Sequence, residues 1–548
     1  MSSSKKKQLR KEQYMTERQT ASAKEAKALK RYTITFWVVI LVVASIFIGA
    51  VVANPLKNMT VANAKALQVG DYTLSAAELN YYYIDTINEY IQDYSSYLSL
   101  LMDTSKPLNQ QVVNMDTGAT WADNFLESAK ENIKSVYAVY DAAMKDGFQL
   151  SESGKTSINS TMAMAELYAA YYGYNNVTGY LRAMYGNGAS EKSYRKYLEV
   201  SAIASEYLNQ HSASLEYSAE DLVNYQASAP YKFNSYTFSY YYVSSASFRT
   251  GGTTDEKGNV TYNDMEKLTA EKAAKEAADK LAAGNYADVD DFDYAIMSME
   301  VNAENTTAAA VRNEAVLYSN LPTLMQDWLI GKVASEDANA EPTFEVRNEG
   351  DMTVITNSTT SGETVTVNGY YVVRFGSVET NEFLMKDVRH VLISFEGGTT
   401  DSTTGTTTYS DAEKLVAKEK AEQLLSDWVA AGDVSEESFA ELAKKNSKDG
   451  NAAQGGLYED VYPGQMVASF EDWIYDADRK VGDYGIVETQ YGYHIMFFVG
   501  DAETTFRDYM ITNTVRNEDV KNWQNDLISK LTVEVLTIKH VAMDITLG

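Results

Sequence analysis

Hydrophobic residues form one uninterrupted run near the N-terminus and recur at intervals in the rest of the chain. The run extends from Thr33 to Ala53 and contains no charged side chain. A helix of about 20 apolar residues spans a bilayer core, where every backbone polar group needs a partner within the helix. The pattern therefore predicts a transmembrane helix over residues 33–53.

The flanking charges predict how this helix is oriented. Residues 1–32 contain ten Lys or Arg and three Glu, which gives this basic tail a net charge of +7. Basic residues stay on the cytoplasmic side, so we expect a single-pass protein of the cell membrane with a cytoplasmic N-terminus and its bulk outside. A cleaved signal peptide is the alternative, with Val51–Ala53 as the cleavage site, although both segments are long for one.

Helical spacing dominates residues 67–231. Ser75 and Glu78 match a capping box, and apolar residues then recur every three or four positions from Leu79 to Leu101. Further helices are predicted at about 121–146, 159–172, 190–210 and 218–226. Because no cluster of ligand-type residues occurs here, we interpret this region as a helical lobe without chemistry of its own.

A pattern in the middle of the chain occurs twice, at an offset close to 147 residues. The matched pairs, in chain order, are Phe248–Leu268 with Phe395–Leu415, Asp327–Trp328 with Asp472–Trp473, and Gly369–Tyr371 with Gly492–His494. Several matches in the same order indicate two copies of one module, at 233–380 and 386–502.

Both copies are predicted to have the same order of elements. The opening strands are Tyr236–Ser244 and Val388–Phe395, and the closing strands are Tyr370–Phe375 and Tyr493–Val499. Strands flanked by helices, without strict alternation, favour an α+β sheet. Residues 503–548 return to a helix at about 513–532 and end in an apolar segment.

Composition narrows the class of protein. The chain has 548 residues, 45% of them hydrophobic, which indicates several folded domains and excludes global disorder. Its net charge of −29 includes the basic tail, so the remainder is still more acidic, and a nucleic-acid partner is not expected. The absence of cysteine excludes disulfides, thiolate catalysis and lipid attachment through a cysteine.

The second copy contains the most informative motifs. These motifs lie after the predicted strand that contains Arg389 and His390. In chain order they are Phe439–Ala443, Ser447–Asp449, Gly455–Leu457, Gly464–Met466, Phe470–Trp473 and Thr489–Ile495. Together they resemble the parvulin family of peptidyl-prolyl cis/trans isomerases. The resemblance implies a four-stranded antiparallel sheet wrapped by helices. The helical lobe is similar to the chaperone lobe of SurA- and PrsA-type foldases, which implies that residues 503–548 return to it.

The resemblance also implies the residues of an isomerase site. His390 and His494 would form a buried imidazole pair, with Thr489 hydrogen-bonded nearby, and Asp449 would face the substrate carbonyl. Rotation about an X–Pro bond has a barrier of about 18–20 kcal/mol but requires no nucleophile, so neither a metal nor another cofactor is expected.

Three further residues are implied to line the slot for the proline ring: Leu457, Met466 and Phe470. Each site residue also has a simpler interpretation. A histidine on a strand is usually a satisfied core residue, and Met466 and Phe470 have the i, i+4 spacing of an ordinary helix face. Asp449 could be a turn residue, and two histidines with an aspartate could bind a metal.

The first copy departs from this pattern. At the repeat offset, Val243 stands in place of His390 and Tyr371 in place of His494, and the glycine-rich motifs are missing. We therefore expect the first copy to keep the fold without isomerase activity. The loop at 396–411 contains no Lys or Arg, so recognition of phosphorylated Ser/Thr–Pro is not expected.

These features predict a membrane-anchored foldase. The second copy would act as a parvulin-type peptidyl-prolyl cis/trans isomerase, and the helical lobe would act as a chaperone at the outer face of the cytoplasmic membrane. The expected partners are unfolded secreted polypeptides containing X–Pro bonds, with the membrane bound through residues 33–53, and the sequence leaves homodimerisation open. The alternative is a non-catalytic holdase with both modules idle.

Overall fold

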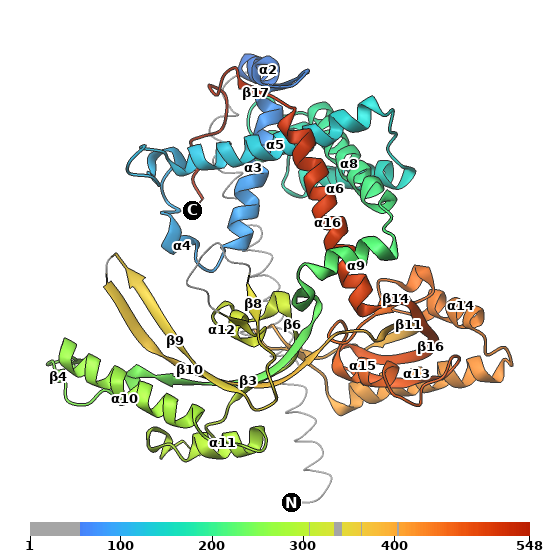
Figure 1. The fold of residues 1–548 in the computed structure, drawn as a ribbon. Coiled ribbons are helices and arrows are strands. Elements are labelled where there is room, and N and C mark those ends of the chain that lie inside the picture. The colour runs from blue at the N-terminus through green and yellow to red at the C-terminus, as the bar shows by residue number, and fades with distance from the viewer. Residues whose placement is uncertain (1–54, 306, 334–341, 363, 403–404, 548) are drawn as a thin grey trace, which may run out of the picture.

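The computed structural model describes residues 55–305, 307–333, 342–362, 364–402 and 405–547. The predicted transmembrane helix at 33–53 and the basic tail lie outside these ranges. Within them, no helix combines the length and the apolar character needed to cross a membrane. Figure 1 shows a helical lobe above two sheet-containing modules, which confirms the mixed α+β architecture.

The lobe is built from helices that the hydrophobic pattern largely anticipated. They are α2 (Pro55–Asn63), α3 (Ala76–Asp93), α4 (Leu98–Leu101), α5 (Trp121–Lys145), α6 (Glu152–Tyr171), α7 (Val177–Tyr185), α8 (Glu191–Ser214) and α9 (Ala219–Ala227). The short α7 was not predicted. The apolar run that begins at Leu79 does not form one helix, because two serines of low helix propensity follow Tyr94 and the chain turns before α4.

The predicted capping box at the start of α3 is confirmed. The backbone N–H of Glu78 donates to Oγ of Ser75 at 3.2 Å, and the N–H of Ser75 donates to the Glu78 carboxylate at 2.7 Å. This cap starts the helix whose buried face, including Leu79, Tyr83 and Ile87, forms the centre of the lobe core.

The C-terminal segment completes the same lobe. Helix α16 (Phe506–Ser529) leaves the second module and runs upward beside α5 (Figure 1). Strand β17 (Val533–Val535) then pairs with β1 (Lys65–Val69), which also pairs with β2 (Tyr72–Ser75). Three residues of the last segment, Val541, Ala542 and Ile545, are buried in the lobe core. Both ends of the described chain therefore build one core.

Each module contains one four-stranded antiparallel sheet. In the first, the order is β6-β3-β10-β9; in the second it is β14-β11-β16-β15. The strands of the first sheet are β3 (Ser235–Ser244), β6 (Val311–Leu317), β9 (Met352–Ser361) and β10 (Thr364–Glu379). Those of the second are β11 (Leu384–Ser394), β14 (Leu457–Val461), β15 (Tyr484–Thr489) and β16 (Gly492–Thr505). The two sheets share one topology.

Helices surround these sheets in the same order, and each module has a small hairpin after its opening strand; the first module has a second hairpin after α12. The helices of the first module are α10 (Asp264–Ala282), α11 (Val289–Met297) and α12 (Thr323–Leu329). Those of the second are α13 (Asp411–Ala430), α14 (Glu436–Asn446) and α15 (Ala468–Ile474). The hairpins are β4 (Thr253–Thr254) with β5 (Val260–Thr261), β7 (Lys332–Val333) with β8 (Thr343–Phe344), and β12 (Thr399–Thr400) with β13 (Thr407–Thr408).

One capping device recurs in both copies at the hairpin before the long helix. Glu266 caps the start of α10 and also accepts a hydrogen bond from the N–H of Gly252, at 3.2 Å. Glu413 does the same for α13 and the N–H of Gly398, at 3.0 Å. A single carboxylate therefore ties the hairpin to the helix in each copy.

A stacked tryptophan and arginine also recur, although the repeat in the sequence indicated only the tryptophan. The guanidinium of Arg479 lies 3.8 Å from the ring centre of Trp473, and its Nε donates to the Trp473 carbonyl at 2.8 Å. Arg347 and Trp328 make the equivalent contacts at 5.0 Å and 3.0 Å. The repeat therefore extends to a contact between the tryptophan of α12 or α15 and an arginine in the segment that follows the helix.

A buried arginine joins the lobe to both modules. Arg507, in the first turn of α16, is 5% exposed. Its guanidinium donates to the carbonyls of Pro230 and Phe233, which follow α9, and to that of Thr380, which follows β10. The side chain of Asn381 also donates to the Phe233 carbonyl, at 3.0 Å. The junction is therefore held by hydrogen bonds from several chain segments.

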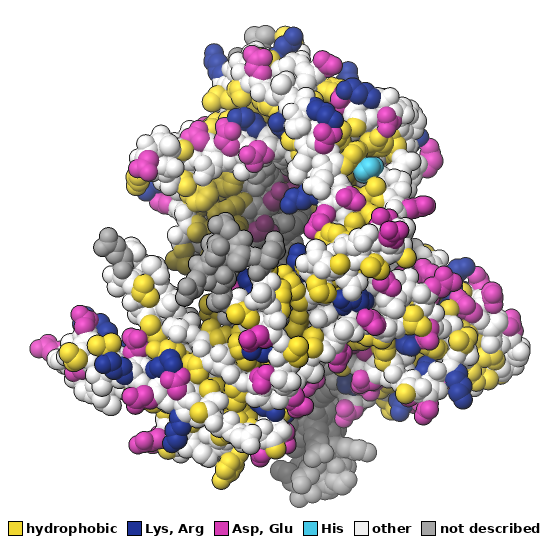
Figure 2. Space-filling view, viewed as in Figure 1, with side chains coloured by type: hydrophobic (Ala, Val, Ile, Leu, Met, Phe, Trp, Pro, Cys, Tyr) yellow, Lys and Arg dark blue, Asp and Glu magenta, His cyan; other side chains and the backbone are white. Residues whose placement is uncertain are grey.

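A hollow lies beneath the helical lobe in this arrangement. Figure 2 shows apolar side chains along part of its rim, together with scattered acidic and basic side chains. The domain boundaries proposed from the sequence, 67–231, 233–380, 386–502 and 503–548, stay predictions.

Replacing Arg507 with Leu is expected to destabilise the junction by about 3 kcal/mol, because several buried carbonyls would lose their donor. Urea denaturation of the full-length protein measures this loss. Arg516→Leu, on the same helix, is the matched control and is expected to cost less. Equal losses from the two substitutions would contradict the role assigned to Arg507.

Candidate isomerase site in the second module

Strand pairing brings the two predicted histidines together. In the second sheet, β11 and β16 are adjacent, with His390 opposite Met496 and Leu392 opposite His494. Residues opposite each other or two positions apart share one face of a sheet. His390 and His494 therefore point to the same side as diagonal neighbours.

The two imidazoles are buried and hydrogen-bonded to each other. Their Nδ1 atoms are 2.9 Å apart, and the rings are inclined by only 14°. His390 is 2% exposed and His494 is 5% exposed. On the outer sides of the pair, Nε2 of His494 lies 2.9 Å from Oγ1 of Thr489, and Nε2 of His390 lies 3.5 Å from Oδ1 of Asp449. The four residues thus form one row.

Accounting for hydrogens gives this row a direction. If the Thr489 hydroxyl donates to Nε2 of His494, then Nδ1–H of His494 donates to His390. The remaining hydrogen of His390 then lies on Nε2 and points toward the Asp449 carboxylate. The reverse arrangement would place a nitrogen lone pair against that carboxylate, because each neutral imidazole has one donor and one acceptor. The first assignment turns the Nε2–H of His390 toward the carboxylate, 3.5 Å away, although this buried nitrogen makes no hydrogen bond within the described residues.

The pKa values of His494 and Asp449 agree with a neutral imidazole at the first residue and an ionised carboxylate at the second. Burial, together with the neighbouring His390, lowers the pKa of His494 to about 4. The contact with His390 holds the pKa of Asp449 well below its usual range, although burial opposes this. The backbone N–H of Asn451 and the hydroxyl of Tyr458 also donate to Asp449. The site therefore maintains a negative charge beside the imidazole pair.

Phe470 covers the imidazole pair from helix α15. Its ring lies edge-on to both histidines, with ring centres 5.4 Å from each. Met466 is half-buried and packs against the same apolar cluster. Leu457 starts β14 and is half-buried, but its side chain is not a member of this cluster. Phe470 is therefore brought to the imidazole pair and Met466 to the cluster around Phe470, whereas Leu457 is not a member of that cluster.

The loop before β14 reaches the site because it contains glycine. Gly456 has a φ of 67°, and a Cβ atom there would lie 2.1 Å from the carbonyl oxygen of His390. This close approach lets the N–H of His390 donate to the Gly456 carbonyl at 2.9 Å. The glycine therefore allows the loop carrying Asn451 to pack against β11.

Sequence reasoning missed Tyr458. Its hydroxyl donates to Asp449 at 3.0 Å, and its ring lies 5.2 Å from that of His390. Burial raises the pKa of Tyr458 to about 12, so it stays a donor. Its position next to Leu457 was the only signal in the sequence.

The geometry argues against a metal bound between the histidines. Their Nδ1 atoms face each other at hydrogen-bond distance, so no lone pair is left to converge on an ion. In the described ranges, no group of three or more His, Cys, Asp or Glu side chains is arranged to hold a metal.

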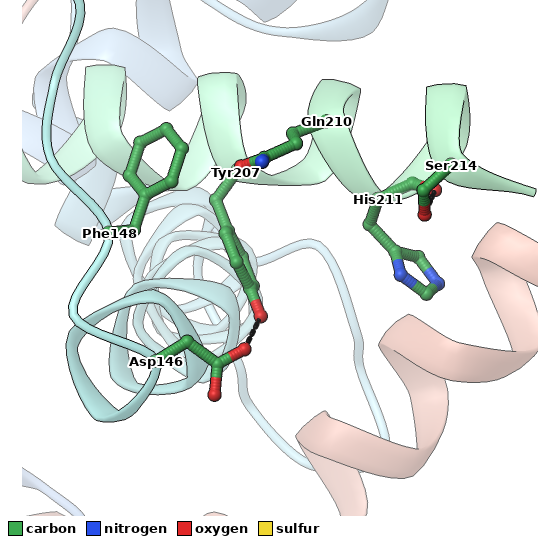
Figure 3. Close-up of a pocket in the computed structure, with 6 residues that line it drawn as sticks. All are labelled: Asp146, Phe148, Tyr207, Gln210, His211 and Ser214. Carbon is green, nitrogen blue, oxygen red and sulfur yellow. Dashed lines mark hydrogen bonds between the residues drawn. The ribbon is translucent and has the colours of Figure 1, made fainter.

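A cavity in the helical lobe is distinct from this site. Its volume is about 360 Å³, and its walls are Asp146, Phe148, Tyr207, Gln210, His211 and Ser214 (Figure 3). The Tyr207 hydroxyl donates to Asp146, and the His211 ring stacks on Trp523 of α16 at 4.0 Å. The hydrogen bond joins α8 to the end of α5, and the stacked rings pack α16 against α8. The cavity contains no imidazole pair.

Strand register corrects the comparison with the first copy. Gly369 lies opposite Ser244 in the first sheet, as Gly492 lies opposite Ser394 in the second. Counting back along the opening strands places Tyr240, and not Val243, at the position of His390. The fixed offset misleads because a short 3-10 helix follows β3. As a result, Phe248 lies three residues farther from the end of β3 than Phe395 lies from the end of β11.

The first copy therefore has two tyrosines where the second has its histidines. The rings of Tyr240 and Tyr371 are 5.5 Å apart and nearly perpendicular. The positions of Met466 and Phe470, aligned on the shared tryptophan, are occupied by Leu321 and Met325, which are buried against the same face. The apolar part of the site is thus present in both copies, and the imidazole pair in one.

Comparison with known proteins agrees with this geometry. Residues 370–501 match the family described as PPIC-type PPIASE domain. The chain contains a parvulin-type isomerase domain. The predicted family and the predicted enzyme class are therefore confirmed for this part of the chain.

Foldases of Listeria are among the relatives that this chain resembles. Foldase protein PrsA 1 of Listeria innocua is 40% identical over 68 residues, which is 12% of this chain and 23% of the relative. Foldase protein PrsA 1 of Listeria monocytogenes is 38% identical over the same shares. The alignment thus spans less than a quarter of the relatives' length.

Two solved structures match the chain at lower sequence identity than the Listeria foldases. Peptidylprolyl isomerase PrsA from Bacillus anthracis is 20% identical and covers 27% of this chain and 58% of its own, with a TM-score of 0.17. A SurA-like chaperone from Campylobacter jejuni is 23% identical and covers 27% and 55%, with a TM-score of 0.16. These scores do not extend the likeness to the arrangement of the whole chain.

Acidification is expected to destabilise the second module. Because the pKa of His494 falls from 6.5 when unfolded to about 4 when folded, its contribution is complete above pH 6.5 and is lost as the pH falls toward 4. The expected loss is on the order of 3 kcal/mol. The lowered pKa of Asp449 acts in the same direction only below its ordinary range, near pH 4.

Urea denaturation of the full-length protein between pH 4 and 7.5, with hydrogen-exchange pulses read on β11 and β16, measures this dependence. His494→Gln lacks the titrating ring and should show a shallower decline over the same interval. A decline as steep as that of the unaltered protein would exclude His494 as its source.

Proposed function

We propose that this protein is a peptidyl-prolyl cis/trans isomerase and chaperone that assists the folding of secreted polypeptides at the outer face of the cytoplasmic membrane. The second module performs the isomerisation, and the helical lobe holds the unfolded chain. The observation that carries the proposal is the row of Thr489, His494, His390 and Asp449, closed on one side by Phe470.

Catalysis of this reaction requires that the twisted amide be favoured over the planar one. In the planar amide, resonance places negative charge on the carbonyl oxygen, and twisting removes it. An ionised Asp449 facing that oxygen disfavours the planar form more than the twisted form. Selective stabilisation of the transition state relative to the ground state is what raises the rate.

The imidazole pair acts as a positioning unit in this proposal. Nδ1–H of His494 fixes the tautomer of His390, whose Nε2–H then faces Asp449. The hydroxyl of Tyr458 and the N–H of Asn451 hold the same carboxylate from other sides. None of these residues needs to transfer a proton during the reaction.

Met466 and Phe470 supply the apolar slot for the proline ring. Both belong to the cluster that packs around α15, and Phe470 is 2% exposed whereas Met466 is half-buried. Apolar contact orients the ring, and removal of water from the carbonyl strengthens the effect of Asp449. Leu457 is proposed as the outer margin of this slot.

The first module has no isomerase role in this proposal. Tyr240 and Tyr371 stand where the histidines would be, and neither can reproduce a chain of two imidazole nitrogens. The chaperone role of the lobe and the cellular location rest on the similarity to PrsA-type foldases and on residues 33–53, which lie outside the described ranges. A non-catalytic holdase is the alternative.

Two substitutions should separate binding from catalysis in a prolyl-peptide isomerisation assay of the full-length protein. Asp449→Ala is expected to lower kcat by at least about tenfold with little change in KM, because its charge acts on the twisted amide. Met466→Ala is expected mainly to raise KM, because it removes apolar contact made equally in both states.

The equivalent positions of the first copy provide matched controls. Leu321→Ala and Tyr371→Ala should leave both constants unchanged. If isomerisation with the unaltered protein is no faster than the uncatalysed reaction, the protein is a non-catalytic holdase and the proposed enzyme activity is wrong. If Asp449→Ala keeps full kcat, the carboxylate has no part in catalysis.

A further inference from the structure

The outer strand of the first sheet lacks the features that normally protect a sheet edge. Strand β9 lies at the edge of the order β6-β3-β10-β9, and in the described part of the chain no strand pairs with its outer side. Its sequence from Met352 to Ser361 contains ten residues without a charge or a proline. Proteins usually protect exposed edges with charged residues, proline, bulges or short strands, because free backbone groups recruit other chains.

The other edges of the two sheets carry such features. Strand β6 contains Arg312 and Glu314, and its regular pairing is broken at Ala315, which has a φ of 47°. Strand β14 contains Asp460 with a φ of 55°. Strand β15 is six residues long and contains Glu488, which is paired with Lys414. Among these four edges, β9 alone is long and uncharged. The one irregularity in its pairing, between Val367 and Gly369, places the extra residue on β10 and not on β9.

The two copies differ in the hairpin that presents this edge. In the second copy, β15 ends at Thr489, which lies opposite Gly492 across a two-residue turn. In the first copy, the equivalent pair is Asn357 with Gly369, and the ribbon continues to Ser361 paired with Thr364. Figure 1 shows this ribbon extending beyond the sheet toward the helical lobe. The first copy has therefore lengthened the hairpin that carries the unprotected edge.

The side chains of this extension are exposed and of the type that suits added strands. Ser358, Thr359 and Thr360 are exposed, and Val365 on the neighbouring strand is 61% exposed. Threonine and valine favour extended backbone and pair well across strands. The ribbon therefore combines free backbone groups with side chains that do not hinder a further strand.

We propose that β9 binds an extended polypeptide segment, which adds a fifth strand to the first sheet. Main-chain hydrogen bonds supply the affinity, so the segment needs little sequence identity, but it must be free of proline where it pairs, because proline lacks the N–H donor. The proposal rests on the proposed function in that the segment belongs to a client polypeptide. The first module then retains clients while the second acts on their X–Pro bonds.

A client segment fits this edge better than a second copy of the chain. A stable dimer buries about 1,200–2,000 Å² with a largely apolar centre, whereas the exposed side chains here are mainly Ser and Thr. Two copies would also bring together chains with a net charge of −29 each. A single polar ribbon instead supports weak, reversible binding of varied chains.

Hydrogen–deuterium exchange of the full-length protein tests this proposal. The probe is a proline-free peptide of alternating Thr and Val with one Lys at each end, and its control has the same sequence with alternate backbone nitrogens methylated. The unmodified peptide is expected to slow exchange of β9 amides and leave those of β15 unchanged. The methylated peptide should protect neither strand. Equal protection of both strands, or by both peptides, would overturn the proposal.

Edge charges provide the matched variants. Thr356→Lys with Ser358→Lys gives β9 the protection that the other edges have, and is expected to weaken peptide binding by about fivefold or more. Thr364→Lys with Thr366→Lys adds the same charges to β10 and should bind as the unaltered protein does. Equal binding by the two double variants would contradict a role for β9.

Two further readouts separate this inference from its alternatives. Protection of β9 without peptide that rises with protein concentration, together with a doubled mass, would assign the edge to a second copy and overturn the client proposal. Isomerase activity of the same preparations is measured independently, so its absence would remove the proposed catalysis while the peptide result still decides the role of β9.

Discussion

The hydrogen bond between the Nδ1 atoms of His390 and His494 depends on a single strand register. A shift of one residue between β11 and β16 would turn one histidine to the opposite face of the sheet. The rest of the site depends on the same pairing. Thr489 is positioned by the pairing of β15 with β16, and Asp449 lies in the loop that packs against β11. Gly456 makes that packing possible by bringing the loop backbone to His390. The polar row is therefore a consequence of backbone pairing.

The two copies show which contacts belong to the fold and which belong to the site. The glutamate that joins hairpin and helix, and the arginine stacked on tryptophan, occur in both. They fasten neighbouring elements to one another and do not depend on the residues at the centre of each sheet. The central face differs, with two tyrosines in one copy and two histidines in the other. One framework can therefore carry two different surfaces, because its stabilising contacts lie away from them.

The modules are fixed to the lobe by the return of the chain. Helix α16 begins at the second module, places Arg507 against the ends of α9 and β10, and leads to β17 in the lobe. A guanidinium can satisfy several carbonyls at once because it has five donors. This arrangement holds the hollow beneath the lobe between elements that are far apart in sequence, and it directs the long β9–β10 ribbon toward the lobe (Figure 1).

The sequence alone determined the repeat, most of the helices and the residues of the imidazole pair, because each leaves a local signature: a spacing, a cap or a motif. It correctly matched Tyr371 with His494. It matched Val243 with His390, where strand register requires Tyr240, because a fixed offset cannot account for an inserted turn. The contact of Tyr458 with His390 and the Arg507 junction arise between distant segments and have no local pattern. In the Trp–Arg stacks, the arginine follows its tryptophan at a different spacing in each copy, so the repeat offset does not match the two arginines. Only the tertiary structure decided them, because hydrogen-bond partners across a sheet or between domains are set by pairing and packing.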